Sequence, residues 1–504
     1  MRYRFKAYHV VLALGFIGCF VAFSPVLTTP FRSDEWYIAS FARNAPVTLE
    51  TISQASSWEL FGDPRFQPFS HLLLFLIHKV FGNAFVLFHL LSWVSHVTVG
   101  LLIYAIVKEL HSDKMTAALC AILFVTGFSH FDTVSWTYHI YIIHQTICLL
   151  FGFWVALRDP SQLRWWQALI GGILVGFASY FYEAGLAIPV LILVAMSCSK
   201  YETRKSGLGS NSRSILPFVV CLVVGYVAFL GFHLQRVGSQ ISAQIDTSSV
   251  ITGGHNTLKG LWTQGVVGNL GFPPRYSFGD LFYLQGSEFE FLPIFAIVFF
   301  LIAVMRNLGP AAQKSLPRTE NRKYLLLIFL ACAVSYYGII AIGRFNLYVV
   351  TQARYFYLPD AFLVLAFSWP MAAAGSLKLQ NHSKDSAGPL RRVRGIVMRP
   401  QTWAMCAVCV VIILNSYHIF GSCREIAQIV SPVRDSIEAV KDFSRTSKGT
   451  KRLYVDFVPR SMGERLFGGS HIALETCFSN TGILTRQVAK AEYTLGVLRW
   501  SLIM

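Results

Sequence analysis

The sequence predicts an all-α polytopic membrane protein with about eleven transmembrane helices. Three observations predict this fold class. The 504-residue chain is 54% hydrophobic and only 14% charged, whereas soluble domains carry about 25% charged residues. Apolar runs close to the roughly 20 residues that a spanning helix needs recur along the chain. Lysine and arginine gather in alternate connecting segments, as they do in membrane proteins whose basic loops stay in the cytoplasm.

The formal net charge of +17 does not indicate a nucleic-acid-binding protein. The basic excess lies in short segments between apolar runs, which is a signal of topology and not of a continuous binding surface. The 41 Phe, 21 Tyr and 11 Trp residues suit lipid-facing and interfacial positions. We therefore expect membrane lipids as partners and no nucleic acid.

The first apolar run, from Ala7 to Val26, follows the basic sequence MRYRFK. It is longer than the apolar region of a signal peptide. No small-residue cleavage site follows it, because Pro25, Pro30 and Phe31 come next. We interpret this run as the first spanning helix and not as a cleaved leader.

The other predicted spans follow from the same length template. In order, the eleven spans lie near residues 7–28, 84–107, 115–129, 136–156, 166–181, 184–198, 215–234, 290–305, 323–343, 357–376 and 402–421. The pair 166–181 and 184–198 is short and is joined by Phe181-Tyr182-Glu183. Short, broken helices at membrane depth usually line a cavity within the protein.

The placement of Lys and Arg predicts the orientation. The segments rich in these residues are 1–6, 108–114, 157–165, 199–213, 306–323 and 378–399. All of them fall on one side of the eleven-span arrangement, which is therefore expected to be cytoplasmic. The opposite side receives the segments 29–83, 130–135, 182–183, 235–289, 344–356 and 422–504. A bacterial inner membrane is the default location, with this second side facing the periplasm or exterior.

Two domains are expected on this topology. A transmembrane domain covers 1–421, with external loops 29–83 and 235–289, and a small external α/β domain covers 422–504, where RLYVDFV is a plausible strand. Most of the ten cysteines lie within spans, where they act as small apolar residues. Only Cys423 and Cys477 fall in external segments, and the sequence leaves open whether they pair.

The first group of candidate functional residues follows the first span, in Arg32-Ser33-Asp34-Glu35-Trp36-Tyr37. Adjacent acids at a membrane interface are suited to supply a general base or to hold a divalent cation, since hard cations prefer oxygen ligands. A solvated loop with a tryptophan anchor at the interface explains the same residues. Spacing alone favours this second explanation.

The second group, Ser129-His130-Phe131-Asp132-Thr133-Val134-Ser135-Trp136, is a very short external hairpin between two spans. A histidine and an acid two residues apart are able to share a proton or a metal ion. An exposed turn with a helix N-cap is the alternative, because Asp and Thr favour that position. The two interpretations are level.

The third and fourth groups are single charges beside spans. Glu183 stands between two apolar runs with almost no polar sequence around it, which favours a functional role. Arg344 and Arg354 lie outside, against the prevailing trend, and Tyr355 and Tyr357 flank Arg354. An arginine at a helix entrance suits bidentate recognition of a phosphate, and snorkelling to lipid headgroups is the alternative.

Two further stretches complete the set of motifs. The apolar stretch from Phe69 to Val80 has about a dozen residues, too few to span, and is expected to lie along the interface. His89 and His96 are seven residues apart and fall on one helical face. We expect them to make packing or polar contacts between helices, since metal ligation needs closer convergence.

Taken in order from about residue 7 to about residue 365, these motifs resemble those of the polyprenyl-phosphate-dependent glycosyltransferases of the GT-C fold. Members of this group with similar motifs are the protein O-mannosyltransferases, especially those with tetratricopeptide repeats, and the bacterial lipid A aminoarabinose transferases. Asp34-Glu35 looks like the acidic motif of the family's first external loop, and Arg354 with Tyr355 and Tyr357 resembles its Glu-Arg-Tyr-x-Tyr-x-Pro element.

The remaining motifs are similar to the family pattern with one departure each. The departures are Gln67 for Arg before the interfacial helix, Ser92 for Asn between His89 and His96, Asp132 for Glu in His-x-Glu-x-Val-x-Trp, Tyr182 for Lys before Glu183, and Ala353 for Glu before Arg354. The substitutions Gln67 and Tyr182 weaken the transfer of phosphate-binding roles to those two positions. Arg354 still matches the arginine of the Glu-Arg-Tyr-x-Tyr-x-Pro element.

The resemblance implies an inverting glycosyltransferase that takes a sugar from a polyprenyl-phosphate donor. It implies Asp34 as the base, supported by Glu35, and Arg354 with Arg344 as the groups that neutralise the leaving phosphate. His130, Asp132 and Glu183 would orient the sugar, the acceptor or a metal. A divalent cation, Mg or Mn, held by Asp34 and Asp132 is compatible with this scheme but is not required.

Two other functions remain open at this point. A transporter or flippase of lipid-linked glycans would place its charges near the midplane and show repeat symmetry, which this sequence lacks. A glycan polymerase or ligase would share the lipid donor but transfer a chain instead of one sugar. The acceptor of a transferase, whether protein, lipid or cell-surface glycan, has no decisive motif.

Overall fold

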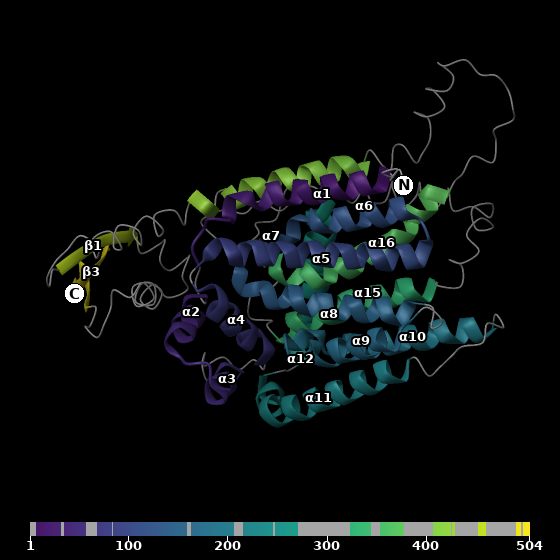
Figure 1. Ribbon diagram of the computed structural model, residues 1–504, viewed down its shortest axis with the longest axis horizontal. Helices are drawn as coiled ribbons and strands as arrows, with labels where there is room; N and C mark the ends of the chain where they lie inside the picture. The colour runs from purple at the N-terminus through teal and green to yellow at the C-terminus, as the bar shows by residue number, and fades with distance from the viewer. Residues whose placement is uncertain are drawn as a thin grey trace, which may run out of the picture.

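The computed structural model describes residues 7–31, 35–56, 68–82, 84–158, 163–205, 215–244, 247–270, 323–343, 353–376, 407–424, 426–428, 452–459, 490–494 and 497–503. These residues form a helical bundle and a small β-sheet (Figure 1). The labelled helices are α1 (Ala7–Phe23), α2 (Glu35–Asn44), α3 (Leu49–Ser56), α4 (Pro68–Phe81), α5 (Phe85–His111), α6 (Lys114–Val125), α7 (Phe131–Ser135), α8 (Ile140–Leu157), α9 (Trp165–Ala178), α10 (Ile188–Lys205), α11 (Leu216–Gln244), α12 (Thr247–Gly260), α15 (Lys323–Gly343) and α16 (Tyr357–Ser376).

Short irregular helical turns join several of these helices. They are the 3-10 turns η1 (Ser24–Val26), η3 (Phe128–His130), η4 (Thr137–His139), η5 (Glu183–Ala187), η8 (Gly268–Leu270) and η12 (Ala353–Phe356), and the π-helix η7 (Leu261–Val267). Such turns bring backbone carbonyls and side chains out of the regular helical pattern, and π-helical segments occur often at functional sites. Most of the candidate functional residues that the structure describes lie in or beside these turns.

Six helices among the described residues are long and apolar enough to cross a membrane, which makes the chain an integral membrane protein. They are Ala7–Val26, Phe85–His111, Thr137–Leu157, Leu216–Gln235, Tyr324–Gly343 and Ala407–Gln428. A bent pair, Lys114–Val125 with Phe128–Ser135, gives a seventh if it counts as one span. These six agree with the expected spans at 7–28, 84–107, 136–156, 215–234, 323–343 and 402–421.

The other expected spans differ from simple membrane-crossing helices. The span 115–129 ends at Val125, and the chain bends by 48° before continuing from Phe128. The spans 166–181 and 184–198 are the shorter helices Trp165–Ala178 and Glu183–Ser199. Span 357–376 coincides with α16, and 290–305 lies outside the described residues. The total of eleven stays a prediction.

Helices α9 and α11 pack with their backbones in direct contact. A Cβ atom added to Gly176 would lie 2.7 Å from the Cys221 carbonyl oxygen, and one added to Gly225 would lie 2.9 Å from the Gly176 backbone. Small residues permit this approach, which is common between helices in membranes. The close contact holds the C-terminal end of α9, where the chain enters the break around Glu183.

The helices α2, α3 and α4 form a separate layer beside the ends of the long helices (Figure 1). Ala42, Ala55 and Phe75 make a small buried cluster between them. With 14 residues, α4 is too short to span, as expected for the stretch 69–80. Its backbone is tied to the end of α9, since the Phe69 amide donates to the Tyr180 carbonyl at 3.1 Å.

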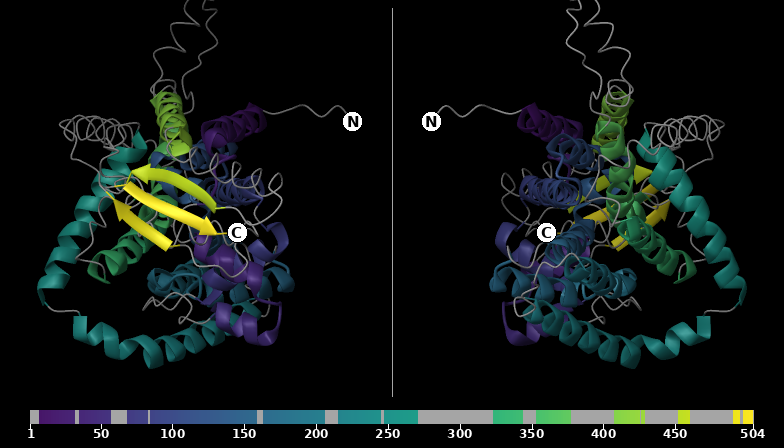
Figure 2. Two further views of the ribbon diagram at one scale, coloured as in Figure 1. Left: turned by 90° about the vertical axis from the view of Figure 1, so that its left-hand side faces the viewer. Right: turned by 90° about the vertical axis from the view of Figure 1, so that its right-hand side faces the viewer.

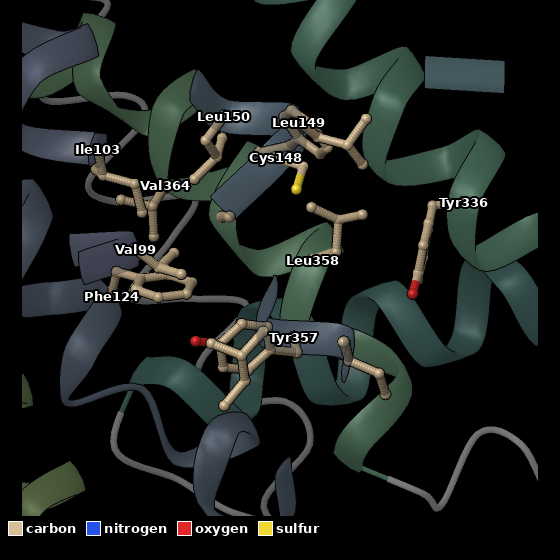
Figure 3. Packing of buried hydrophobic residues seen from close by; sticks show 14 of the residues in the cluster. Val99, Ile103, Phe124, Cys148, Leu149, Leu150, Tyr336, Tyr357, Leu358 and Val364 are labelled. Carbon is tan, nitrogen blue, oxygen red and sulfur yellow. The ribbon is translucent and has the colours of Figure 1, made fainter. Parts of the chain in front are cut away.

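The main hydrophobic core lies among α5, α6, α8 and α16, with α15 beside them (Figure 3). The side chains drawn there include Val99 and Ile103 of α5, Phe124 of α6, Leu149 and Leu150 of α8, Tyr336 of α15, and Tyr357 and Val364 of α16. This packing fixes the start of α16, and therefore the turn η12 that immediately precedes it.

The loop expected at 235–289 is helical where it is described. Helix α11 extends to Gln244, and α12 leaves it at a sharp angle (Figure 2). Helix α12 packs against α15, and the following π-helix η7 contacts α16. As a result, Asn269 in η8 reaches the residues of the hairpin 128–136.

The C-terminal strands form a three-stranded antiparallel sheet in the order β1-β3-β2 (Figure 2). They are β1 (Arg452–Pro459), β2 (Lys490–Thr494) and β3 (Val497–Ile503). The stretch RLYVDFV lies in β1, so this segment is a strand as expected. The α part of the expected α/β domain, and its boundary at residue 421, stay predictions, as does a bond between Cys423 and Cys477, since Cys477 lies outside the described residues.

Candidate functional site

Seven of the nine candidate residues lie in the described part of the chain. These are Glu35, His130, Asp132, Glu183, Arg354, Tyr355 and Tyr357, whereas Asp34 and Arg344 lie outside it. The seven occupy four segments: the start of α2, the hairpin 128–136, the turn η5 and the turn η12 with the start of α16. Three of these segments are short turns between helices, where charged side chains are able to escape the apolar bundle.

Arg354 and Asp132 form an ion pair between η12 and α7. The Arg354 Nη1 and Asp132 Oδ2 atoms are 3.9 Å apart, and the side chains are 15% and 18% exposed. This separation exceeds the 2.7–2.9 Å of a close charge-assisted hydrogen bond. The two groups are therefore an ion pair without a close hydrogen bond between them.

Aromatic rings hold the Arg354 guanidinium from two sides. Its Cζ atom lies 5.3 Å from the centre of the Trp136 ring and 5.2 Å from that of Tyr355. Burial lowers the pKa of Arg354, but the neighbouring Tyr355 and Asp132 raise it by more, so the pKa lies above its ordinary value. The group is therefore a fixed positive charge throughout the physiological range.

Glu35 is buried at the start of α2, with 3% of its surface exposed. Its carboxylate accepts a hydrogen bond from the Thr137 hydroxyl in η4, immediately after Trp136. A negative charge in the first turn of a helix is also stabilised by the helix dipole. The acidic motif of the first loop is therefore attached to the segment that carries Asp132, and Glu35 is not a solvated loop residue.

Glu183 begins the turn η5 and is half-buried. The chain around it is anchored by Gln145 of α8, whose amide nitrogen donates to the carbonyls of Ala178 at 3.0 Å and Tyr182 at 2.6 Å. The Tyr336 hydroxyl of α15 donates to the Gln145 carbonyl oxygen at 3.3 Å. Both η5 and η12 pack against α15, so the segments of Glu183 and Arg354 share one supporting helix.

His130 does not face Asp132, although the two are close in sequence. Its Nε2 atom lies 3.3 Å from Asp360 Oδ2, and both side chains are fully buried. Residues two apart on a helical backbone point about 200° apart around its axis, so His130 points into the bundle and Asp132 toward Arg354. The shared proton or metal envisaged for His130 and Asp132 is replaced by two separate pairs.

Asp360 was not predicted from the sequence to take part in this arrangement. It sits in the first turn of α16, directly after Pro359, in the apolar run predicted as a span. Ionisable groups within spans are costly and usually have a partner or a role. The same rule that singled out Glu183 would have found it.

Tyr357 is also in the core and not at the site surface. Its hydroxyl lies 2.7 Å from His96 Nδ1, and His96 Nε2 lies 3.0 Å from the Val125 carbonyl oxygen. Figure 3 shows the Tyr357 ring among Val99 and Phe124. His89 similarly lies 3.1 Å from the Thr29 hydroxyl. Both histidines make the polar contacts between helices that their spacing predicts.

A metal centre made of three protein ligands is not found in the part of the chain described here, where no group of three His, Cys, Asp or Glu side chains converges. The Mg or Mn ion expected between Asp34 and Asp132 stays a prediction, because Asp34 lies outside the described residues. Asp132 is the described member of that pair.

No protein-family model and no curated protein matches the chain. Among solved structures, it is similar to the archaeal oligosaccharyltransferase AglB from Archaeoglobus fulgidus, solved with an inhibitory peptide and a dolichol-phosphate. The TM-score is 0.45 at 14% identity, over 84% of this chain and 56% of that one. The chain thus spans a little over half the length of that protein.

A second similar structure is ArnT from Cupriavidus metallidurans bound to undecaprenyl phosphate. Its TM-score is 0.42 at 14% identity, over 88% of this chain and 82% of that one. With TM-scores below 0.5, neither likeness by itself indicates an activity for this chain.

Proposed function

We propose that the chain is an integral membrane glycosyltransferase that moves a sugar from a polyprenyl-phosphate donor to an acceptor at the non-cytoplasmic face. The observation that carries this proposal is the Arg354–Asp132 pair, a fixed cation and a carboxylate that are both largely buried between η12 and α7. The ordered series of acidic and basic motifs in the sequence supports it.

Arg354 is the proposed binding group for the donor phosphate. A guanidinium presents several N–H donors in a plane and binds phosphate through two of them. The rings of Trp136 and Tyr355 keep this group in one orientation. When the sugar leaves, negative charge grows on the phosphate, and a cation that is already in place stabilises that charge without further reorganisation.

Asp34 is the proposed general base, an assignment that rests on the sequence resemblance. It directly precedes Glu35, whose carboxylate is anchored to Thr137. The Asp34 carboxylate takes the proton of the acceptor hydroxyl, and the resulting oxygen attacks the anomeric carbon. The bond from that carbon to the phosphate oxygen breaks, and its electron pair leaves with the lipid phosphate. In-line attack of this kind inverts the anomeric configuration.

The remaining acidic residues would orient the reactants. Asp132 faces Arg354 at 3.9 Å, and Glu183 lies in a turn that packs against α15, as η12 does. A divalent cation held by Asp34 and Asp132 would add positive charge beside the phosphate. The acceptor class, whether protein, lipid or glycan, follows from none of these residues.

The test is transfer of a labelled sugar by the purified protein in lipid nanodiscs. Arg354→Ala should lower transfer at least 100-fold. Arg158→Ala is the matched control, because Arg158 also stacks on a tryptophan, with its Cζ 4.7 Å from the Trp154 ring, but lies in a segment predicted to be cytoplasmic. Equal activity of the two variants would show that Arg354 has no role in sugar transfer. Mass spectrometry of the lipid that copurifies with the protein identifies the donor.

A transporter of lipid-linked glycans is the second candidate. The fully buried pair His130–Asp360 favours it, because ionisable pairs inside a helical bundle occur along transport pathways. Reconstituted vesicles separate the two functions. A transporter would move a fluorescent lipid-linked glycan across the bilayer without changing it, whereas the proposed enzyme would release free polyprenyl phosphate.

A further inference from the structure

We infer that Asp360 is a positioning residue that sets the geometry of the Arg354–Asp132 pair from inside the bundle. The inference rests on the proposed function, in which this pair meets the donor phosphate. Two chain segments are involved, the hairpin 128–136 and the stretch 353–360, which comprises η12 and the start of α16. They meet at the site and again in the core, where the His130 and Tyr357 ring centres also lie 4.9 Å apart.

The first junction is at the site itself. The Arg354 guanidinium faces the Asp132 carboxylate at 3.9 Å, and the Thr133 hydroxyl lies 3.5 Å from the Arg354 carbonyl oxygen. Both contacts are long for hydrogen bonds, whose usual donor–acceptor distance is 2.7–3.2 Å. Trp136 of the hairpin also stacks on the Arg354 guanidinium, with 5.3 Å from the ring centre to Cζ, so this junction combines one stacking contact with two long polar contacts.

The second junction is fully buried. The Asp360 carboxylate accepts a hydrogen bond from the Ser129 hydroxyl and lies 3.3 Å from His130 Nε2. All three side chains have no exposed surface. Low-dielectric surroundings strengthen such contacts and make the loss of one partner costly. This junction adds a buried hydrogen bond to the polar and stacking contacts at the site.

Further helices hold the second junction in place. The Ser129 hydroxyl also lies 3.0 Å from the Asn269 side-chain oxygen in η8. The backbone carbonyl of Asn269 accepts a hydrogen bond from the Asn415 amide at 2.8 Å. The π-helix η7 passes close by, since a Cβ atom on Gly265 would lie 3.2 Å from Asp360 Oδ1. The junction is thus attached to elements that do not carry the site.

Asp360 and Ser129 lie near Arg354 and Asp132 in the chain, so the buried junction limits how far the two site residues can move. Asp360 follows Arg354 by six residues in continuous helical structure, a distance of about 9 Å at 1.5 Å per residue. Ser129 precedes Asp132 by three residues. Two junctions this far apart fix the register of the segments as well as their separation. An apolar contact at Asp360 would fill the same space but would leave the segments free to slide.

The first test is hydrogen–deuterium exchange, which does not depend on any activity. Asp360→Ala should raise exchange about tenfold in peptides covering 128–136 and 353–357, and Asp360→Asn, which still accepts from Ser129, should restore part of the protection. Ser368→Ala is the control. It removes a buried contact on the same helix, in which the Ser368 hydroxyl lies 2.9 Å from His111 Nε2. Unchanged exchange in both Asp360 variants overturns the inference.

The second test asks whether Asp360 acts through Arg354. Asp360→Asn and Arg354→Lys should each lower turnover about tenfold, and the double variant should be no slower than the worse single variant, because residues that act through one contact are not additive. A hundredfold loss in the double variant would show independent roles and refute the inference. Ser129→Ala gives the same comparison if Asp360→Asn does not fold.

The two proposals fail in different ways. If the wild-type protein neither transfers sugar nor binds polyprenyl phosphate, the proposed function is wrong, and the exchange result still decides the role of Asp360. If the wild-type protein is active but Asp360→Asn changes neither exchange nor turnover, the proposed function stands and the positioning role is wrong.

Discussion

The contact between α9 and α11 gives a prediction whose size follows from the structure. A Cβ atom on Gly176 would lie 2.7 Å from the Cys221 carbonyl oxygen and 3.1 Å from that of Leu222, whereas ordinary contacts begin at 3.4 Å. Gly176→Ala must therefore separate the two backbones by up to 0.7 Å, the difference between 3.4 Å and 2.7 Å. The contacting atoms belong to the backbone and cannot rotate away.

Overpacking of this kind costs about 1–3 kcal/mol. Alanine in place of glycine also stabilises a helix by up to about 1 kcal/mol. Gly231→Ala on α11 isolates this second effect, because no atom lies within 4 Å of a Cβ atom added there. We therefore expect Gly231→Ala to be neutral or slightly stabilising and Gly176→Ala to be less stable than Gly231→Ala by about 2 kcal/mol.

The assay is thermal unfolding in detergent, followed by intrinsic tryptophan fluorescence. The melting temperature of Gly176→Ala should be lower than that of Gly231→Ala by a few degrees. Sugar transfer should fall as well, because α9 leads directly into the turn that carries Glu183. Equal melting temperatures for the two variants would refute the direct backbone contact between α9 and α11.

Four further predictions concern the site and its supports. Glu35→Ala should lower transfer much more than Glu35→Gln, because the amide still accepts from Thr137; initial rates at matched protein levels check this. Gln145→Leu leaves two buried carbonyls without their donor and should destabilise the protein by about 1–3 kcal/mol, with increased hydrogen exchange over 178–183 and unchanged exchange in α5. Tyr357→Phe should cost about 1–3 kcal/mol by leaving a histidine nitrogen without its partner, with transfer by the folded fraction unchanged. The pKa of Arg354 is raised above that of an ordinary arginine. The stabilisation from its pair with the Asp132 carboxylate is therefore complete at any pH below the ordinary arginine pKa, and it is lost only when the pH rises through the raised pKa. The rate of transfer should therefore show no Arg354-dependent decline between about pH 6 and 9.

Much of the fold was predictable because a spanning helix depends mainly on its own composition. A run of about 20 apolar residues has few alternatives to a helix at membrane depth. The spans expected at 84–107 and 136–156 accordingly match Phe85–His111 and Thr137–Leu157 within a few residues. Where the apolar runs were shorter, composition alone did not determine the length and direction of the helix, and tertiary contacts did. The 48° bend after Val125 and the 14-residue helix α9 belong to this second kind.

The sequence predicts which residues make up the candidate site, and that prediction stays untested; it does not predict how the described ones pair. Topology placed Asp132 and Arg354 on one face, and their 3.9 Å separation agrees with that. The partner of His130 was not predictable, because Asp360 is 230 positions away in the chain, and only the packing of α16 against the hairpin brings the two together. Asp132 on one side of the hairpin faces Arg354, and His130 on the other side faces Asp360 in the core.

The Arg354–Asp132 distance raises a last question, whether the donor phosphate binds beside this pair or between its members. Asp132 stands where the resembling family has Glu, and the 3.9 Å gap exceeds a close ion pair by about 1 Å. One additional methylene group is long enough to close it. Asp132→Glu should therefore bring the carboxylate into direct contact with the guanidinium.

If the phosphate binds between the two groups, Asp132→Glu will compete with it and raise the KM for the lipid donor while leaving kcat unchanged. If the phosphate binds to the opposite edge of Arg354, the closer pair will leave KM unchanged, because the edge that binds the donor stays open. Asp132→Asn separates charge from length, since it keeps the shorter side chain but removes the negative charge. Full activity of Asp132→Asn, with normal KM and kcat, would show that the carboxylate has no part in the site.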